Sequence, residues 1–439
     1  MSIKKIAALL SSVLMVTGLL AGCGASGNSG KSGKTEITFW SAPNPPQTKF
    51  WKTMANDFEK KNPNITVKVT QMKESPSSEA TIQSAVASHT TPTMSENITR
   101  SFAAQLAASK AIIPLNKLSG VQTVVKNREM TKTVKGWTFS DNNQYVLPVY
   151  SNPILFAWRL DTLKKLGYSE PPKTYTEFLQ VGKKLKAMDS DKYMWAKPAL
   201  ADPTSWQRWF DFFLLYHAAS NGNSYISGQK FVANAKAGKE VLTFMDQMRK
   251  EKLLLIKQST DPFETGTALM ADNGPWSFPN WAEKYPKLKY GKTYTLAAPP
   301  VPDSMKNVEH PYTYADSKGI VIYASATAAQ KKAAVKFMNF VFSNPKNDLT
   351  FLKTTNLIPA RDNAAGTKAF TAFFNSNPGL KVYAENVKYG VPAMDNKNYN
   401  DLMQIIGVQA FNPVVRGQKS PTKAWNDLVK AEKEALAKQ

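Results

Sequence analysis

Tryptophans that lie beside proline, asparagine or arginine are the side chains with the clearest chemical use in this sequence. The chain has ten tryptophans and sixteen tyrosines, and several of the tryptophans lie in loop-like contexts and not inside apolar stripes. An indole ring in such a place can stack on a flat apolar ligand face, while nearby polar groups orient the ligand by hydrogen bonds. This chemistry is non-covalent recognition.

Patterns that would indicate catalysis or metal binding are missing from the sequence. The 33 acidic residues include no carboxylate pair in a signature context, and there is no Gly-x-Ser-x-Gly elbow. Gly30-Lys31-Ser32 matches the end of a phosphate-loop pattern, but Ala25 stands where that pattern needs glycine. We predict no catalytic residue, no metal and no cofactor, and we expect surface or satisfied core positions for the three histidines, which lack metal-ligand spacing: His89, His217 and His310.

The single cysteine, Cys23, follows a segment with the features of an export signal. Lys4 and Lys5 precede an apolar run, Ile6–Leu20, that is too short for a confident membrane span. Leu20-Ala21-Gly22 directly before the cysteine resembles the lipobox of bacterial lipoproteins. The resemblance implies cleavage before Cys23 and attachment of a diacylglyceryl group and a further acyl chain such as palmitate, which together anchor better than one chain. The alternative is an ordinary signal that leaves an unpaired thiol.

Length and charge narrow the class of protein further. A chain of 439 residues is too long for one ordinary core, so we expect two lobes, and no second apolar run approaches membrane length. The net charge of +23 favours anionic surroundings such as a Gram-positive wall, anionic lipid or an anionic ligand. The alternative is that scattered lysines only keep the protein soluble. Nucleic-acid binding is not expected because no binding module is recognisable.

The elements that must position the candidate side chains alternate between strands and helices. Glu36–Trp40 and Ile65–Val69 are strand-like and flank a helical segment, which is the opening of an α/β lobe with a parallel sheet. The Pro/Gly-rich segment Asn273–Pro286 predicts loop and short turns. We expect a buried strand at 319–323 and further helices at 81–88, 101–109, 176–188, 206–217, 239–252, 328–342 and 425–437.

Several stretches resemble a known family when they are taken in sequence order. They are Ile37-Thr38-Phe39-Trp40, residues 147–153 leading into 158–161, residues 170–174, Gly266–Met270 with Asn273-Gly274-Pro275-Trp276, and residues 331–342 with 356–361. Together they resemble bacterial extracellular solute-binding proteins of the maltose-binding and multiple-sugar-binding type, the receptors of ABC importers. Departures at 92–97, 158–159 and 312–315 fall where ligand is usually read, so they bear on the ligand and not on the fold.

The resemblance implies a two-lobed periplasmic-binding-protein-like α/β fold. Each lobe would be a mainly parallel sheet flanked by helices, and ligand would lie in the interlobe cleft. Hinge closure can sense ligand because ligand contacts both lobes only in the closed state. The implied divisions are a lipoprotein signal peptide at 1–22, a flexible tether at 23–34, a first lobe at 35–149 with 318–358, and a second lobe at 150–317 with 359–439.

Trp276 is the first candidate for ligand binding. It follows the Asn273-Gly274-Pro275 turn at the position where the family stacks an aromatic ring on the sugar. The alternative is a core tryptophan that caps the second lobe. Trp40 ends the first strand, and ligands of open α/β sheets bind beyond the carboxyl ends of strands, but this ring can equally pack on the following helix.

Polar candidates follow the third expected strand of the first lobe. Glu96, Asn97 and Arg100 fall where the family often places hydroxyl-binding residues. A carboxylate accepts from two hydroxyls and an arginine donates in a fork, which together orient a ligand. The alternative is a helix start, capped by Asn97 or Thr99.

The remaining candidates lie in the expected second lobe or at its borders. Asn152 follows the first crossover and can both donate and accept, or can form a hinge turn with the next proline. Trp206, Arg208 and Trp209 enter a helix, where a spacing of three places one ring in the core and the other in the cleft, and we expect Trp206 in the cleft. Weaker candidates are Tyr312, Tyr399 and Arg361, of which the last can equally pin a lobe boundary.

These observations predict a binding protein and not an enzyme. We expect a monomeric receptor, lipid-anchored at Cys23 on the extracytoplasmic face of a Gram-positive cell membrane, that captures a carbohydrate, most simply an oligosaccharide, and delivers it to an ABC permease. A phosphorylated polyol such as glycerol-3-phosphate is the alternative ligand. Two other classes remain open: an exported carbohydrate-active enzyme and an adhesive surface lipoprotein.

Overall fold

A strand-helix-strand unit opens the folded part of the chain, as the sequence predicts. The computed structural model describes residues 33–438, and from Lys34 onward the chain forms one unit by itself. β1 (Thr35–Ser41) buries alternate residues and pairs in parallel with β2 (Ile65–Gln71) along its whole length. Between them α1 (Pro45–Lys61) begins at Asn44, whose side chain accepts from the Gln47 N–H. A capping residue followed by prolines is a strong local helix start.

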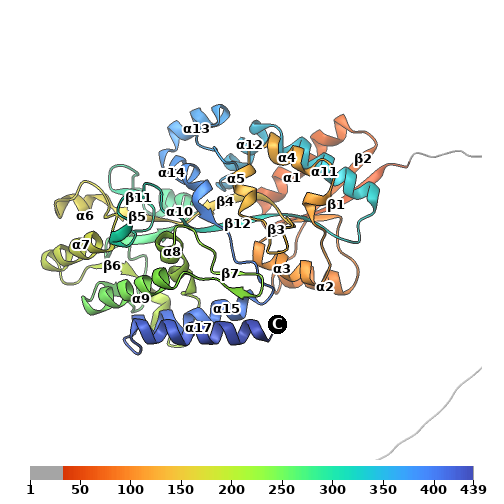
Figure 1. The fold of residues 1–439 in the computed structure, drawn as a ribbon. Helices are drawn as coiled ribbons and strands as arrows, with labels where there is room; N and C mark the ends of the chain where they lie inside the picture. The colour runs from red at the N-terminus through yellow and green to blue at the C-terminus, as the bar shows by residue number, and fades with distance from the viewer. Residues whose placement is uncertain (1–32, 439) are drawn as a thin grey trace, which may run out of the picture. The chain divides into compact units, whose positions relative to one another are not determined.

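The first sheet has six strands with helices on both faces. The elements around it are β3 (Met94–Ile98), β4 (Leu147–Pro153), β12 (Thr313–Ile322), β13 (Gly390–Val391), α2 (Ser78–Ala87), α3 (Arg100–Ala108), η1 (Leu115–Lys117), α4 (Val121–Asn127), α5 (Thr131–Lys135), α11 (Ala328–Phe342) and α12 (Pro345–Thr355). The strand order is β13-β12-β3-β1-β2, and β4 also pairs with β12. One core unites α1, α4, α11 and α12 on β1, and another holds α2 and α3 with Trp137 (Figure 1).

The second sheet has the order β11-β5-β10-β6-β9. Its strands are β5 (Leu155–Arg159), β6 (Tyr193–Ala196), β9 (Leu254–Leu255), β10 (Ala268–Asn273) and β11 (Tyr294–Ala297), and the small hairpin β7 (Ile226–Ser227) and β8 (Lys230–Phe231) stands apart. The helices are α6 (Leu160–Lys165), α7 (Tyr175–Met188), η2 (Pro198–Ala201), α8 (Trp209–Ala219), α9 (Ala235–Lys250), α10 (Ser277–Lys284), η3 (Asp303–Met305), η4 (Lys368–Phe370), α13 (Thr371–Ser376), α14 (Pro378–Asn386), η5 (Val387–Tyr389), α15 (Tyr399–Ile405), η6 (Ile406–Phe411), α16 (Asn412–Val415) and α17 (Pro421–Ala437).

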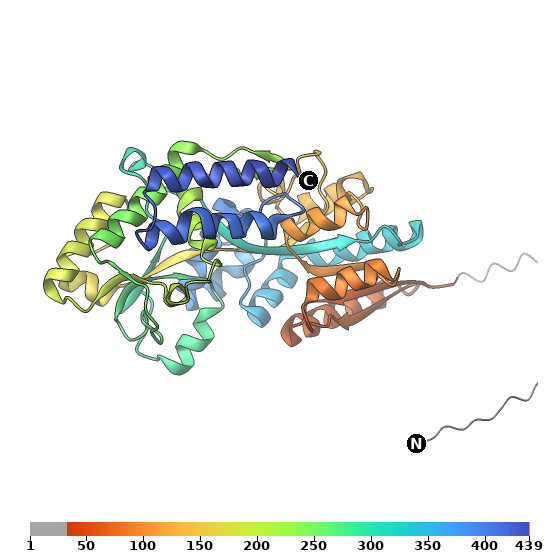
Figure 2. The same cartoon turned by 90° about the horizontal axis from the view of Figure 1, so that it is seen from below.

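Two hydrophobic cores cover the faces of the second sheet. α7, α8, α9 and α17 contribute to one core, and α10, α13 and α14 contribute to the other. In Figure 1, α9 and α17 lie below the strands while α13 and α14 lie above them, and Figure 2 shows the same fold from below. Two sheets with separate helical layers confirm the two-lobed α/β prediction. Both sheets are mixed, because β12 pairs antiparallel with β3 and β4, and β5 with β10 and β11.

The segments that connect the two sheets pair with one another. β4 runs through Ile154 directly into β5, and β12, which follows β11 of the second sheet, pairs with β4 from Ala315↔Pro153 to Ile320↔Leu147. The segment that follows α12 also lies beside β4, since Ser151 N donates to the Ile358 carbonyl at 2.9 Å and Ala360 N to the Val149 carbonyl at 3.1 Å. The lobe boundaries expected from the sequence stay a prediction.

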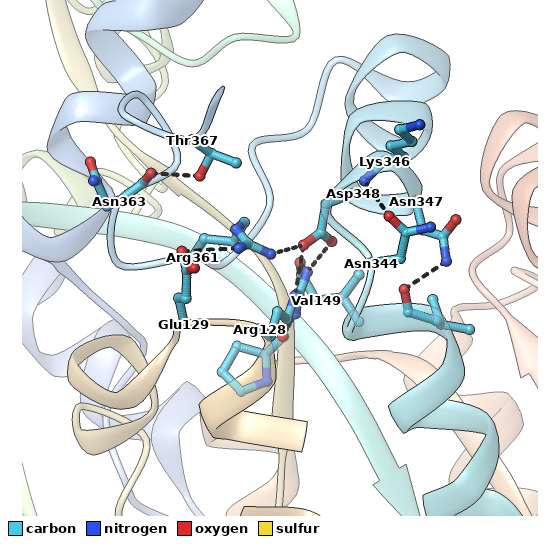
Figure 3. A network of polar contacts seen from close by, with 12 residues as sticks. Arg128, Glu129, Val149, Asn344, Lys346, Asn347, Asp348, Arg361, Asn363 and Thr367 are labelled. Atoms are coloured by element: carbon cyan, nitrogen blue, oxygen red, sulfur yellow. Dashed lines mark hydrogen bonds and ion pairs between the residues drawn. The ribbon is translucent and has the colours of Figure 1, made fainter. Parts of the chain in front are cut away.

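A buried ion-pair network pins this connection. Arg128 donates to Asp348 at 3.2 and 2.8 Å and to the carbonyls of Pro148 and Val149 at 2.5 and 2.6 Å, which ties α4 and α12 to β4 (Figure 3). Arg361 donates to the same Asp348 at 3.2 Å and to Glu129 at 3.0 Å. The geometry of Arg361 therefore matches its alternative interpretation, a residue that pins a boundary.

Each helix that the sequence analysis expects by residue range lies within four residues of an observed helix at both ends, while helices such as α4 and α12 were not expected. The helix expected at 328–342 is α11, which begins with a capping box of Thr327 and Gln330. The prediction of only loop and turns for Asn273–Pro286 is wrong, because α10 occupies Ser277–Lys284. Pro279 is the third residue of that helix, where its missing N–H breaks no helical hydrogen bond. Within residues 33–438 no helix is long and apolar enough to cross a membrane.

Candidate functional site

Aromatic side chains from three separate elements line a pocket of about 330 Å³. Trp209 and Phe210 open α8, Tyr314 and Asp316 stand on β12, and Trp276 lies between β10 and α10; Ile154 completes the lining. Tyr314 and Asp316 share a face of β12 because side chains two apart on a strand point the same way. The pocket therefore offers aromatic surfaces and a single carboxylate.

Trp276 presents its ring to this pocket through an unusual turn. β10 ends at Asn273, and a Cβ added to Gly274 would lie 2.2 Å from the Trp276 ring, so only glycine allows the ring to fold over the turn. Trp276 is 48% exposed, the highest value among the exposed large hydrophobic residues of 33–438. A large exposed aromatic ring in a concave pocket is a typical ligand contact.

The part of the lining around Tyr314 is held by ring packing. Tyr314 contacts Trp209 and Phe210 edge-on, with centroid distances of 5.9 and 5.4 Å, and stacks on Phe213 at 6.3 Å. Edge-to-face and offset contacts at these distances are favourable beyond the area that they bury. The wall is consequently preorganised for contact with a flat partner.

A buried charge cluster supports the elements that carry the pocket. Lys197 contacts Asp211 at 2.8 Å and also pairs with Asp272, while Arg208 pairs with Asp211 and lies 3.6 Å from Asp272. Burial would raise the pKa of Asp272, but the charges of Lys197 and Arg208 outweigh it and hold that pKa well below its usual range. Trp195 Nε1 also donates to Asp272 at 3.0 Å. The cluster joins β6, the start of α8 and β10, and so fixes Trp209 relative to Trp276.

Asp316 and Asn152 meet where β12 pairs with β4. The two residues are register partners, and Asn152 is fully buried, with its Oδ1 accepting from the Ile358 N–H at 3.0 Å. Burial raises the pKa of Asp316, and the nearby charge of Lys318 opposes this shift. The geometry of Asn152 thus links two connecting segments directly behind the pocket.

The predicted polar residues of the first lobe are largely used within the protein. Glu96 is buried and accepts from the Ala42 N–H at 2.7 Å and from Gln47 Nε2 at 3.2 Å, and burial raises its pKa to about 7. Asn97 has a φ of 69° and donates to Ser78 Oγ at 3.0 Å. Thr99, and not Asn97, caps α3, because its side chain accepts from the Phe102 N–H.

Arg100 and Tyr312 do not line the aromatic pocket but a neighbouring cavity. Arg100 donates to the carbonyls of Thr138 at 2.7 Å and Ala393 at 3.3 Å. Trp40 is partly buried and packs against the core of α2 and α3.

The two other aromatic candidates lie close to the pocket-bearing elements. Trp206 precedes α8 and its backbone carbonyl packs against Gly407, where a Cβ would come within 2.2 Å. Tyr399 begins α15, is buried, and donates its hydroxyl to Glu79 of α2 at 2.9 and 3.0 Å. The structure puts Trp209, and not Trp206, among the pocket lining, while ligand contact by either stays a prediction.

Sequence reasoning missed four lining residues: Ile154, Phe210, Tyr314 and Asp316. The alternation of Tyr314 and Asp316 with buried neighbours along β12 is a signal that could have indicated them. Within residues 33–438, no group of three His, Cys, Asp or Glu side chains could hold a metal ion.

Comparisons with known proteins agree on one family. A family model described as bacterial extracellular solute-binding protein matches residues 53–382. The crystal structure of an uncharacterized protein from Listeria monocytogenes EGD-e is 64% identical, with a TM-score of 0.90 over 92% of this chain and 100% of the other. The cyclic alpha-maltosyl-1,6-maltose binding protein from Arthrobacter globiformis is 16% identical with a TM-score of 0.75, over 93% and 100% of the chains, which is a likeness of fold alone.

One curated relative matches over a shorter length. The arabinooligosaccharide-binding protein of Bacillus subtilis (strain 168) is 27% identical over 183 residues. The match covers 40% of this chain and 40% of the relative, so the chain spans less than half the length of that protein.

Proposed function

Because the chain belongs to the bacterial extracellular solute-binding proteins, we propose that it captures an oligosaccharide in the aromatic pocket and delivers it to the permease of an ABC importer. The exposed ring of Trp276 facing a pocket lined by Trp209, Phe210 and Tyr314 carries this proposal. A sugar has flat C–H faces and a rim of hydroxyls, so rings can stack on it while a carboxylate such as Asp316 accepts from hydroxyls. The names of the Bacillus and Arthrobacter proteins support the same class of ligand.

Ligand capture would work by hinge closure between a first lobe at 35–149 with 318–358 and a second at 150–317 with 359–439. The pocket draws its lining from β12, which belongs to the first sheet, and from α8 and the β10–α10 turn of the second. A ligand that contacts both sets of residues stabilises the arrangement in which they are close. The other residues that the sequence predicts for ligand binding remain proposed contacts in such a closed state: Trp40, Glu96, Asn97, Arg100, Asn152, Trp206, Arg208, Tyr312 and Tyr399.

The charges of the pocket favour a neutral sugar over glycerol-3-phosphate. Its lining has one acidic residue, Asp316, and neither lysine nor arginine. A phosphate group there would be repelled by the carboxylate and would find no cation to pair with. Neither arginine named for a phosphate, Arg100 or Arg208, lines this pocket, and Arg208 is paired with Asp211.

A thermal-shift screen tests the class of ligand. Arabino- and malto-oligosaccharides, their monosaccharides and glycerol-3-phosphate would each be added to the protein, because a ligand that binds only the folded state raises the melting temperature. We expect a shift with at least one oligosaccharide. A shift with glycerol-3-phosphate alone would contradict the proposal.

A binding role predicts that the bound glycan leaves unchanged. The family consists of binding proteins. Incubation of each ligand found in the screen with purified protein, followed by chromatography of the glycan, should show no turnover. Any cleaved product that disappears in a Trp276→Ala control would indicate an enzyme instead.

Lipid anchoring at Cys23 is the proposed means of keeping the receptor beside its permease. The family is extracellular, and residues 1–22 and Cys23 lie outside the described residues. A tether at 23–34 would raise the effective concentration of the receptor at a Gram-positive membrane. Cys23→Ala should release a protein that still binds ligand but supports less uptake, and loss of ligand binding in the released form would contradict this separation.

A further inference from the structure

A second cavity, of about 590 Å³, lies beside the aromatic pocket and shares only Tyr314 with its lining. One side is formed by Phe213 and His217 of α8 and by the loop that follows, and the other by the segment around α5. Tyr312, Tyr314 and residues 387–394, next to the connecting strands, complete it. The volume lies within the range typical of small-molecule sites and is far larger than an inorganic anion needs.

The charge of this cavity is of one sign. Arg100, Lys132, Lys135 and Lys388 line it, and the lining includes no Asp or Glu. Among the ion pairs of residues 33–438, none involves the three lysines, and the one pair of Arg100, to Asp395, spans 3.9 Å. The cavity therefore holds more positive than negative charge, and cations gathered in a concave site raise the local concentration of anions.

The interior of the cavity is aromatic and polar. Tyr312 meets Tyr389 edge-on at 5.7 Å, and His217 stacks on Phe213 at 5.4 Å. His217 is only 4% exposed, and its Nδ1 has no hydrogen-bond partner among the described residues. Burial lowers the pKa of His217 to about 3, so the ring is neutral near pH 7. A buried polar atom without a partner is rare and can be satisfied by a ligand.

We propose that this cavity binds an organic phosphate, with the phosphate on Arg100 and the lysines and the organic body against the tyrosines and His217. The four cations favour a ligand with a phosphate group, because charge-assisted hydrogen bonds are the strongest that side chains offer to an oxyanion. The volume of the cavity and its aromatic side chains favour a ligand that also has an organic part. The site is distinct from the aromatic pocket, whose only charged lining residue is Asp316.

Tyr314 couples the two sites. It lines both cavities, with Phe210 on the side of the aromatic pocket at 5.4 Å and Phe213 on the other side at 6.3 Å. An organic phosphate that shifts or rigidifies this ring changes the wall on which the sugar stacks. The coupling is reciprocal by linkage, and it alone rests on the proposed function.

Calorimetric titration without sugar tests the site itself. The probe is glucose 6-phosphate, with glucose and inorganic phosphate titrated separately, and the proteins are the wild type, Lys132→Gln/Lys388→Gln and the control Lys353→Gln/Lys430→Gln. The control lysines are exposed, lie outside the cavity lining and remove the same charge. This matching is needed because a chain of net charge +23 attracts anions everywhere.

We expect saturable binding of glucose 6-phosphate at one site, weakened about tenfold or more by the cavity variant and little by the control. Equal weakening by both variants, or no binding at all, would overturn the site. If inorganic phosphate binds as tightly as glucose 6-phosphate, the proposed contact with the organic part of the ligand is wrong. If glucose binds as tightly, the proposed role of the phosphate group is wrong.

A second titration tests the coupling. The oligosaccharide found by thermal shift is titrated with and without saturating glucose 6-phosphate, and a changed affinity is expected. An unchanged affinity would overturn the coupling while leaving the anion site standing. Absence of any sugar binding would refute the proposed function and not the anion site, because the first titration contains no sugar.

Discussion

Replacing Trp276 with alanine removes the largest exposed surface that the aromatic pocket offers. A tryptophan buries up to about 250 Å², and Trp276 is 48% exposed, so about 120 Å² remains for a ligand to cover. At roughly 25 cal/mol per Å² this area is worth about 3 kcal/mol. A sugar covers one face of the ring, so we expect a loss of about 1.5–3 kcal/mol, or roughly 10- to 150-fold in Kd.

The fold should tolerate this change because half of the side chain already faces solvent. Unfolding in urea should therefore give the variant a stability within about 0.5 kcal/mol of wild type. Met188→Ala is a matched control, since Met188 is 44% exposed at the end of α7 and lies outside the pocket lining. Calorimetry with the oligosaccharide found by thermal shift would measure both variants.

The outcome that would refute this reasoning is a Trp276→Ala protein that binds the sugar within twofold of wild type. Gly274→Ala offers an independent check of the ring position. Its Cβ would lie 2.2 Å from the Trp276 ring, so the ring must move and the affinity should fall even though the indole is still present. Unchanged affinity in Gly274→Ala would show that the ring orientation does not matter.

Two further predictions concern stability. Asp348→Asn leaves the buried guanidinium groups of Arg128 and Arg361 without their shared carboxylate, so the free energy of unfolding in urea should fall by about 3–5 kcal/mol; a fall below about 1 kcal/mol would contradict the role of the network. Burial raises the pKa of Glu432 from its usual value of about 4.5 to about 8, although the hydrogen bond from the Tyr225 hydroxyl opposes this shift. Between these two pH values the carboxyl group keeps its proton in the folded state and loses it in the unfolded state. The contribution of Glu432 to stability should consequently be complete below about pH 4.5 and be lost as the pH rises to about 8. In urea unfolding, Glu432→Gln should flatten the fall of the unfolding free energy between pH 5 and 8. An unchanged slope would exclude Glu432 as its source.

Much of the fold was predictable because its signals are local. The strand pattern of 36–40, the helical spacing of 328–342 and the capping residues each depend on neighbours a few positions apart. The failure at 273–286 has a local cause too. Composition treats every proline as a helix breaker, whereas Pro279 lies in the first turn of α10, where proline is tolerated.

The candidate site was predictable only in part. The Asn273-Gly274-Pro275-Trp276 motif identified Trp276, which lines the pocket. The choice between Trp206 and Trp209 could not be made from their spacing, because the start of α8 at Trp209 decides which ring meets Tyr314. Glu96 shows the converse, since its residue type fits sugar binding while its partners are Ala42 and Gln47.

The sequence by itself determined the family, the alternation of strands and helices, and the turn that exposes Trp276. Each of these depends on residue order within a short window or on motifs in series. Only the tertiary structure decided that Tyr314 and Asp316 line one pocket with Trp276, and that cations from 100, 132, 135 and 388 share one cavity. The physical reason is chain closure: these residues are brought together by the register of β12 with β4 and by the packing of separate cores, which no short window contains.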